Sequence, residues 1–288
     1  MSFIAVLLSV LLDQGLRHLE HLRGPRWFRA YFESLQFFTH SANYWRATAG
    51  VLVIVLVPAM VTLFIGHLLD HLWVGLGFVF ALLTLLFTLG PSDLHAQTHA
   101  YMQALQQGDE VRAGALAQAL LDAEPPTDGN ARTAAVTRAV LAEANDRLFG
   151  VLFWFALLGP AGAVLYRSSD FLRRLRGHSE YSAEFTGAVI RLHGVLAWIP
   201  AHLAAMAYAF AGSFEDAVSD LKGYYNTCTV RFFQVNNDVL VCAGLGALRA
   251  TAEETGSGRL RAALALVRRT LIIWLVVYGL ITLFGWSW

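Results

Sequence analysis

Long runs of apolar residues alternate with shorter polar stretches along this chain. The runs at 47–69, 72–89 and 270–284 contain few or no charges, and about 20 apolar residues in a helix cross the ~30 Å hydrocarbon core of a bilayer. The run at 3–16 is shorter, which predicts either a short span or a helix lying in the membrane interface. The pattern therefore predicts an all-α fold, a polytopic helical membrane protein with about four spanning helices.

Two further apolar segments carry features that ordinary spans avoid. Segment 148–166 is interrupted by Gly159 and Pro160, and segment 186–211 contains polar residues and Pro200. Proline removes a backbone donor and breaks a helix, and freed backbone groups at membrane depth need protein partners or a lined cavity. We therefore predict re-entrant or broken in-membrane helices here. Two ordinary crossings are the alternative.

The stretches at 91–147 and 213–270 are different, because charged and small residues alternate there with apolar residues at helical spacing. We predict cytoplasmic amphipathic helices, with breaks at Gly108 and at 124–129. Arginine clusters at 17–46, 167–176 and 249–269 predict the cytoplasmic side by the positive-inside rule. The expected organisation is one membrane domain over 1–288, in the inner membrane, with its main loops in the cytoplasm.

Composition supports the membrane assignment and narrows the partners. The 288 residues are 56% hydrophobic and only 15% charged, and the net charge is zero. A soluble domain carries about 25% charged residues, and a neutral chain has no bulk attraction to nucleic acid. We therefore expect a lipid bilayer as partner, no nucleic acid, and a membrane or cytoplasmic protein as a further partner. The oligomeric state is left open.

Two histidine pairs lie at helical spacing but do not predict a metal. His18 and His21 lack a further ligand motif. His95 and His99, with Asp93, suit a solvated helix face better than a metal site, because water satisfies all three side chains. No metal is predicted.

Polar residues inside the apolar segments are the better candidates, because charge at membrane depth is costly and usually functional. One group lies at the edges of segment 148–166, and a second lies on one face of segment 186–211, where it would line a cavity for an anionic ligand or a partner helix. The alternatives are ordinary juxtamembrane charge for the first group, and for the second a snorkelling arginine with His202 capping carbonyls freed by Pro200. The candidate ligand-binding residues are Asp146, Arg147, Trp154, Tyr166, Arg167, Asp170, Arg191, Trp198 and His202.

The run DRLFGVLFWFALLGPAGAVLYRSSD at 146–170, followed by WIPAHL at 198–203, resembles the CobD/CbiB family of membrane proteins. That family includes the adenosylcobinamide-phosphate synthase of cobalamin biosynthesis. The resemblance implies a nucleotide-dependent ligase, for which ATP and Mg²⁺ are possible cofactors through the resemblance alone.

Departures from the synthase pattern change the expected function. The synthases have a polar NTxDSMxGY stretch and then a DD…NxIPAR run, where this chain has Ser168-Ser169-Asp170 and Trp198-Ile199-Pro200-Ala201-His202. Carboxylates that would hold Mg²⁺ are missing from the motif. Within the family the chain is similar to the AmpE branch, which is associated with β-lactamase induction and cell-wall recycling.

We therefore predict a non-enzymatic inner-membrane regulator that senses a ligand or partner through a polar cavity. The alternative is a membrane enzyme with residual cobinamide-phosphate-synthase activity. A transporter is a weaker third possibility, because too few clean spans exist to build two repeats.

Overall fold

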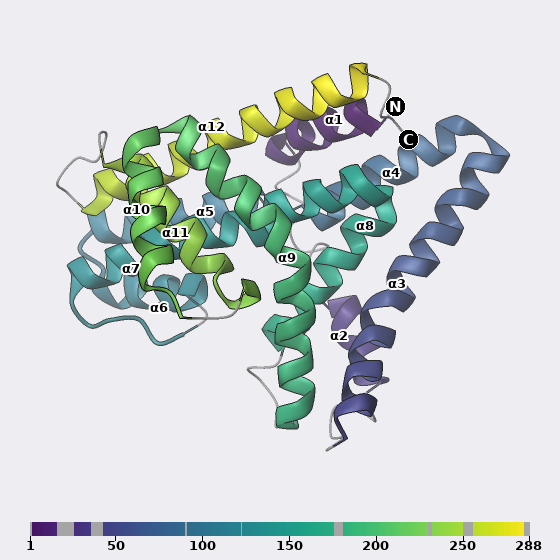
Figure 1. The fold of residues 1–288 in the computed structure, drawn as a ribbon, viewed down its shortest axis with the longest axis horizontal. Coiled ribbons are helices and arrows are strands. Elements are labelled where there is room, and N and C mark those ends of the chain that lie inside the picture. The colour runs from purple at the N-terminus through teal and green to yellow at the C-terminus, as the bar shows by residue number, and fades with distance from the viewer. Residues whose placement is uncertain are drawn as a thin grey trace. The chain divides into compact units, whose positions relative to one another are not determined.

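The computed structural model describes residues 2–15, 26–35, 43–89, 91–121, 123–175, 181–229, 232–249 and 256–284. Every regular element in these ranges is helical, which confirms the predicted all-α fold. Figure 1 shows the helices as a ribbon. The His18–His21 pair and the side chain of Asp93 lie outside the described residues.

The helices form two compact units. The first contains residues 1–90, 146–197 and 278–288, and the second contains 91–145 and 198–277. Two long helices contribute residues to both units. They are α9 (Ala183–Ala211) and α12 (Gly256–Leu283).

The first unit is built from long apolar helices. These are α1 (Ser2–Gly15), α2 (Arg26–Glu33), α3 (Tyr44–Leu72), α4 (Val74–Thr88) and α8 (Gly150–Leu175), with part of α9. Helix α3 packs against α4 and α8, and α1 packs against α4. A hydrophobic core joins Phe28 and Phe32 of α2 to Ile54 of α3, Leu172 of α8 and Phe185 of α9.

The second unit contains the shorter helices α5 (Pro91–Gln106), α6 (Glu110–Leu121), α7 (Gly129–Ala144), α10 (Phe214–Thr227) and α11 (Asn236–Leu248). The two predicted breaks are present, between α5 and α6 and between α6 and α7. Helices α10 and α11 run side by side (Figure 1). They approach so closely that a Cβ at Gly246 would lie 2.7 Å from the Cα of Ala217.

Four helical segments among the described residues are long and apolar enough to cross a bilayer, by length and composition. They are Tyr44–Leu72, Gly129–Leu175, Ala183–Ala211 and Gly256–Leu283. Helix α4, expected as a span over 72–89, has only 15 residues, or about 22 Å. The segment at 186–211, for which a re-entrant or half-buried element was favoured, lies within one continuous helix of 29 residues, Ala183–Ala211. Orientation and re-entrance stay predictions.

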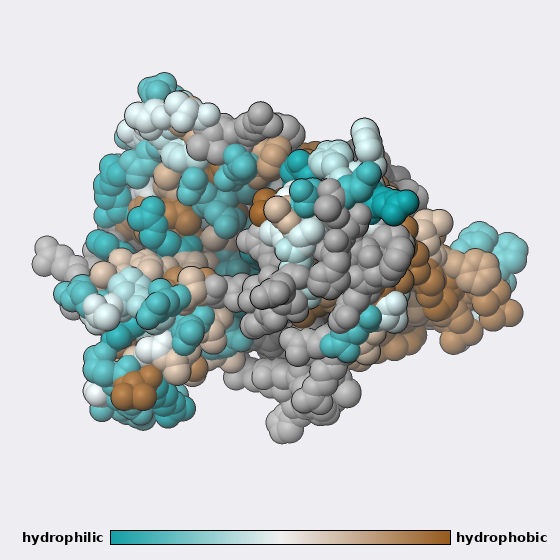
Figure 2. Space-filling view, turned by 90° about the horizontal axis from the view of Figure 1, so that it is seen from below, coloured by the Kyte–Doolittle hydropathy of each residue, from teal (hydrophilic) through white to brown (hydrophobic). Residues whose placement is uncertain are grey.

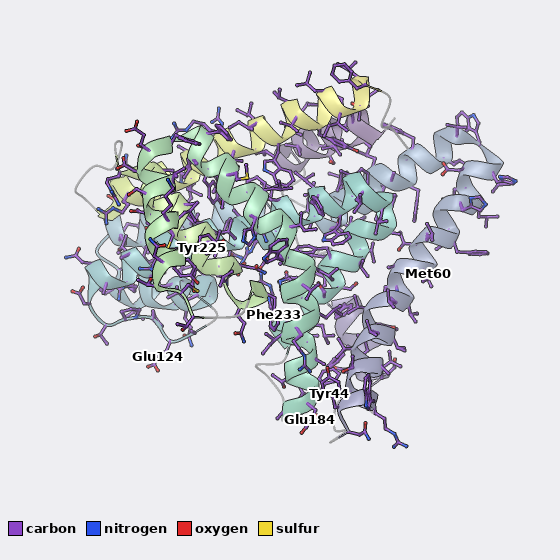
Figure 3. All side chains as sticks on the ribbon, in the orientation of Figure 1. Tyr44, Met60, Glu124, Glu184, Tyr225 and Phe233 are labelled. Atoms are coloured by element: carbon purple, nitrogen blue, oxygen red, sulfur yellow. The ribbon has the colours of Figure 1, made fainter. Side chains whose placement is uncertain are left out.

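Apolar side chains cover the outward face of α3. Met60 is 60% exposed and Phe64 is 70% exposed, and Figure 3 shows Met60 pointing away from its helix. In the space-filling view, apolar surface gathers at the right-hand side over this helix (Figure 2). Large exposed apolar surface of this kind is typical of a lipid-facing helix. The chain is a membrane protein.

The predicted interruption of segment 148–166 is present as a break in α8. Gly159 has a φ of 64° and a ψ of −152°, a backbone conformation open to glycine and strained for other residues. Pro160 follows at once and begins the second half of α8. The half after the break carries the polar residues of the candidate site.

The carbonyl that Pro200 leaves without a backbone donor has a partner in α8. Proline cannot donate to the carbonyl four residues before it, which in α9 is that of Leu196. The Nε1 of Trp154 donates to this oxygen at 3.0 Å. The alternative interpretation of this segment had His202 capping such a carbonyl. Trp154 bonds the Leu196 oxygen, and His202 Nδ1 lies 2.7 Å from the carbonyl oxygen of Trp198.

This bond makes a testable prediction about stability. We expect Trp154→Phe to lower the free energy of unfolding by about 1–3 kcal/mol, because it leaves a carbonyl without its donor. In a Pro200→Ala background the same change should cost less, because the N–H of the new alanine bonds Leu196 itself. Unfolding in lipid or detergent, followed as a double-mutant cycle, measures the difference.

The matched control is Trp45→Phe, the same chemical change at a side chain that is 77% exposed, which should be nearly neutral. An equal cost of Trp154→Phe with and without Pro200 would show that the indole contributes packing alone.

Candidate functional site

The second half of α8 presents a polar face inside an apolar bundle. Ser169 and Asp170 lie three and four residues after Tyr166, and Arg173 lies three residues after Asp170, which places all four on one face of a helix. Tyr166 and Asp170 are completely buried, and Ser169 is 1% exposed. These polar side chains are therefore buried within the protein and are not a solvated surface.

Asp170 lies at the centre of this face and binds three arginines of the same helix. Its Oδ1 accepts from Arg173 Nη2 at 2.9 Å and from Arg174 Nε at 3.1 Å. Its Oδ2 accepts from Arg167 Nη1 at 3.1 Å and again from Arg174 Nε at 3.1 Å. Four accepted bonds use nearly all the lone-pair positions of one carboxylate.

Asp146 reaches the same place from the other end of segment 146–175. It lies in a π-helical turn, Asn145–Phe149, immediately before α8, and such turns inside α-helices are frequent at functional sites. Its Oδ2 accepts from Arg173 Nη2 at 2.9 Å, and its Oδ1 accepts from Tyr166 Oη at 2.9 Å. One guanidinium nitrogen of Arg173 thus bridges the two buried aspartates.

His193 of α9 completes the cluster. Its Nε2 lies 3.4 Å from Asp146 Oδ1, and its Nδ1 lies 3.1 Å from Ser169 Oγ. Because a carboxylate only accepts, Nε2 is the nitrogen that carries a hydrogen toward Asp146. The one hydrogen of the Ser169 hydroxyl has two acceptors in reach, His193 Nδ1 and the carbonyl oxygen of Tyr166 at 2.7 Å. The imidazole is therefore held at both nitrogens, between a hydroxyl and a carboxylate.

Gly150 makes the position of Tyr166 possible. A Cβ at residue 150 would overlap the ring and hydroxyl of Tyr166, so only glycine leaves room for this phenol to reach Asp146. The close approach links the start of α8 to the polar face of its second half.

The cluster has the composition of either a metal site or an anion site. Asp146, Asp170 and His193 each offer a ligand atom, and these atoms lie within 4.8 Å of one another. Arg173 Nη2, however, stands 2.9 Å from an oxygen of each aspartate, where a bridging cation would lie. The guanidinium occupies the cation's position, so this arrangement favours an anionic ligand near the arginines.

The other predicted residues serve different local contacts. Arg147 is buried in the π-helical turn, and Trp154 bonds the Leu196 carbonyl. The guanidinium carbon of Arg191 lies 4.8 Å from the ring centroid of Tyr44, a cation–π contact at the beginning of α3, where Figure 3 labels Tyr44. The polar wall predicted for segment 186–211 stays a prediction.

Trp198 and His202 contact each other, with ring centroids 4.7 Å apart. The Nδ1 of His202 donates to the Trp198 carbonyl oxygen, which can only accept. Its Nε2 lies 2.9 Å from the hydroxyl of Tyr225. Partial burial raises the pKa of the Tyr225 phenol, so this hydroxyl stays protonated and donates to His202.

Sequence reasoning missed four members of the cluster, namely His193, Ser169, Arg173 and Arg174. A signal for His193 was present, because Phe185 and Val189 precede it at four-residue steps and are buried on the same face of α9. Arg191 lies off that face. The arginines were predicted only as a cluster at the membrane edge. Their spacing of three or four residues from Asp170 was not taken into account.

The fold and the site define a class, a helical membrane protein with a buried charged centre. The chain matches the CobD/Cbib protein family over residues 6–265, and it belongs to that family. It is 30% identical over 178 residues to the cobalamin biosynthesis protein CobD of Stutzerimonas stutzeri, covering 60% of this chain and 57% of that protein.

Other relatives have similar names. The chain is 33% identical over 117 residues to the CobD of Chromobacterium violaceum (40% of this chain, 36% of that protein). It is 31% identical over 140 residues to a probable CobD of Thermococcus kodakarensis (47% of this chain, 45% of that protein). The alignments span about half or less of these relatives. No solved structure matches the chain.

These names bear on the two predicted functions. Membership of the CobD/CbiB family is confirmed, whereas the AmpE branch and a signalling role receive no support from the relatives. The name shared by these relatives fits the alternative, a membrane enzyme, better than the regulator.

The position of Arg173 makes a prediction about metal binding. We expect Arg173→Met to create a Mn²⁺ site on Asp146, Asp170 and His193, because it removes the guanidinium from between the two carboxylates. The wild type should bind Mn²⁺ much more weakly. Electron paramagnetic resonance of Mn²⁺ with protein in nanodiscs distinguishes bound from free ion.

The control is Arg173→Met combined with Asp146→Asn, which removes one ligand and should abolish the new site. Equal Mn²⁺ binding by the wild type and the Arg173→Met protein would show that Arg173 does not take the cation's place.

Proposed function

We propose that this protein is a membrane enzyme that forms an amide, joining a corrinoid acid to a phosphorylated amino alcohol in a nucleotide-dependent reaction. The observation that carries the proposal is the buried cluster of Asp146, Asp170, His193 and the surrounding arginines. The resemblance to the adenosylcobinamide-phosphate synthase supplies the substrate class, and it is supported by membership of the CobD/Cbib family and by relatives named for cobalamin biosynthesis.

The cluster supplies two functions that amide synthesis needs. An attacking amine must lose a proton, and an imidazole held by a carboxylate is a common acceptor. His193 with Asp146 at 3.4 Å is such a pair, and Nδ1, which faces the Ser169 hydroxyl, is the nitrogen that takes up the proton. Phosphoryl groups of a nucleotide or of the amino alcohol need cationic donors. Arg167, Arg173 and Arg174, which lie around Asp170, are the donors in this proposal. ATP with Mg²⁺ supplies the activation of the acid when it is bound.

The cluster bears on the argument that favoured a regulator, although Arg173 stands where a cation held by its two carboxylates would lie. That argument rested on the loss of adjacent carboxylates from the family's motif. Asp146 and Asp170 are far apart in the sequence, yet the same nitrogen of Arg173 contacts both. A pair of carboxylates is thus present in space. The signalling role stays a prediction from the likeness to the AmpE branch.

The enzyme proposal predicts a loss of turnover in two variants. We expect His193→Gln and Asp146→Asn each to lower the rate of amide formation about 10²–10⁴-fold, the usual contribution of a general base. The assay uses protein in nanodiscs with ATP, Mg²⁺, cobyric acid and an amino alcohol phosphate, and mass spectrometry detects the amide.

Glu184→Gln is the matched control, because Glu184 lies at the start of the same helix as His193 and away from the cluster's bonds (Figure 3). It should keep wild-type activity. No amide from the wild-type protein, with binding of the precursors also absent, would exclude the enzyme and return attention to signalling.

A further inference from the structure

Three arginines on α8 converge on one carboxylate that has no solvent exposure. Arg167, Arg173 and Arg174 lie three residues before, three after and four after Asp170, so all reach the same side of the helix. Each is bonded to Asp170 at 2.9–3.1 Å. The carboxylate therefore fixes the direction of three guanidinium groups at once.

Asp170 and its arginines differ in how accessible they are. The side chain of Asp170 has 0% exposure, whereas those of Arg167, Arg173 and Arg174 have 13%, 20% and 25%. A ligand can reach the guanidinium groups without reaching the carboxylate. Asp170 is thus a positioning residue, and the arginines form the surface that a ligand meets.

The charges of the cluster favour an anion. Arg167, Arg173 and Arg174 each place a positive charge beside Asp170. In a low-dielectric surrounding such charges attract an anion more strongly than they do in water. Planar guanidinium forks match phosphoryl oxygens in two-point bonds.

We infer that Arg167, Arg173 and Arg174 form a receptor for a phosphoryl group, held in its binding geometry by Asp170. The inference rests on the proposed enzyme for the identity of the soluble ligand, a nucleotide or a phosphorylated amino alcohol. An anionic lipid headgroup presents the same phosphoryl chemistry. His193 and Asp146 lie beside the receptor and act on the group to be joined.

The distinguishing experiment is Asp170→Asn. If the arginines acted by charge alone, removing a negative charge beside them would tighten the binding of an anion. If Asp170 holds them in place, the same change weakens binding by about tenfold or more, because the forks lose their common anchor. The measurement is calorimetric titration of pyrophosphate, without metal, into protein in nanodiscs of zwitterionic lipid.

Arg174→Lys is the second variant, because it keeps the charge and removes the Nε that bonds both oxygens of Asp170. It should also weaken pyrophosphate binding by about tenfold. Arg191→Lys is the matched control, since Arg191 contacts Tyr44 in the same unit, and it should leave binding unchanged. Thermal unfolding of each variant checks that it is folded.

The outcomes separate the receptor from the enzyme. Tighter binding in a folded Asp170→Asn protein, or unchanged binding in Arg174→Lys, would overturn the receptor even if amide formation continued. Stabilisation by anionic lipid in the nanodisc and not by pyrophosphate, if lost in Arg174→Lys, would support the receptor and identify the lipid headgroup as its ligand. No stabilisation by either would overturn it, whereas the amide assay decides the enzyme separately.

Discussion

The cost of burying the carboxylate of Asp170 among apolar helices determines much of the first unit. An isolated charge in such surroundings costs several kcal/mol, so three arginines of the same helix must turn toward it. Arg173 then brings in Asp146, and Asp146 brings in Tyr166 and His193. Each polar group in the cluster is held in place because it is a hydrogen-bond or ion-pair partner of another buried polar group.

Backbone requirements of the same kind position the helices that carry this cluster. The positive φ of Gly159 lets α8 change direction before its polar half, and Gly150 leaves space for the Tyr166 ring. In lipid a carbonyl without a donor is costly, so the bond from Trp154 to Leu196 ties α8 to α9 where Pro200 cannot donate. The two helices that supply Asp170 and His193 are thereby fixed beside each other.

The sequence predicted the helical class, the break at Gly159 and several members of the site, because these depend on local chemistry. Apolar length, proline and charged residues in an apolar run are all readable along the chain. The arrangement of Asp146, Asp170 and His193 was not predictable, since it depends on which faces of α8 and α9 pack together. The wall of Arg191, Trp198 and His202 stays a prediction, and the contacts of these residues with Tyr44 and Tyr225 could not be predicted for the same reason.

The absence of a linear motif is weak evidence about chemistry when the residues that matter come from different turns. The acidic pair is missing at the family's usual position, but an acidic pair, an imidazole and three guanidinium groups are gathered in one buried place. Buried charge of this density is expensive to keep for stability alone, since apolar residues of similar volume stabilise a core at least as well. We therefore propose that the charge serves a function, and the acid–base couple and anion receptor proposed here together suit a reaction of phosphorylated substrates.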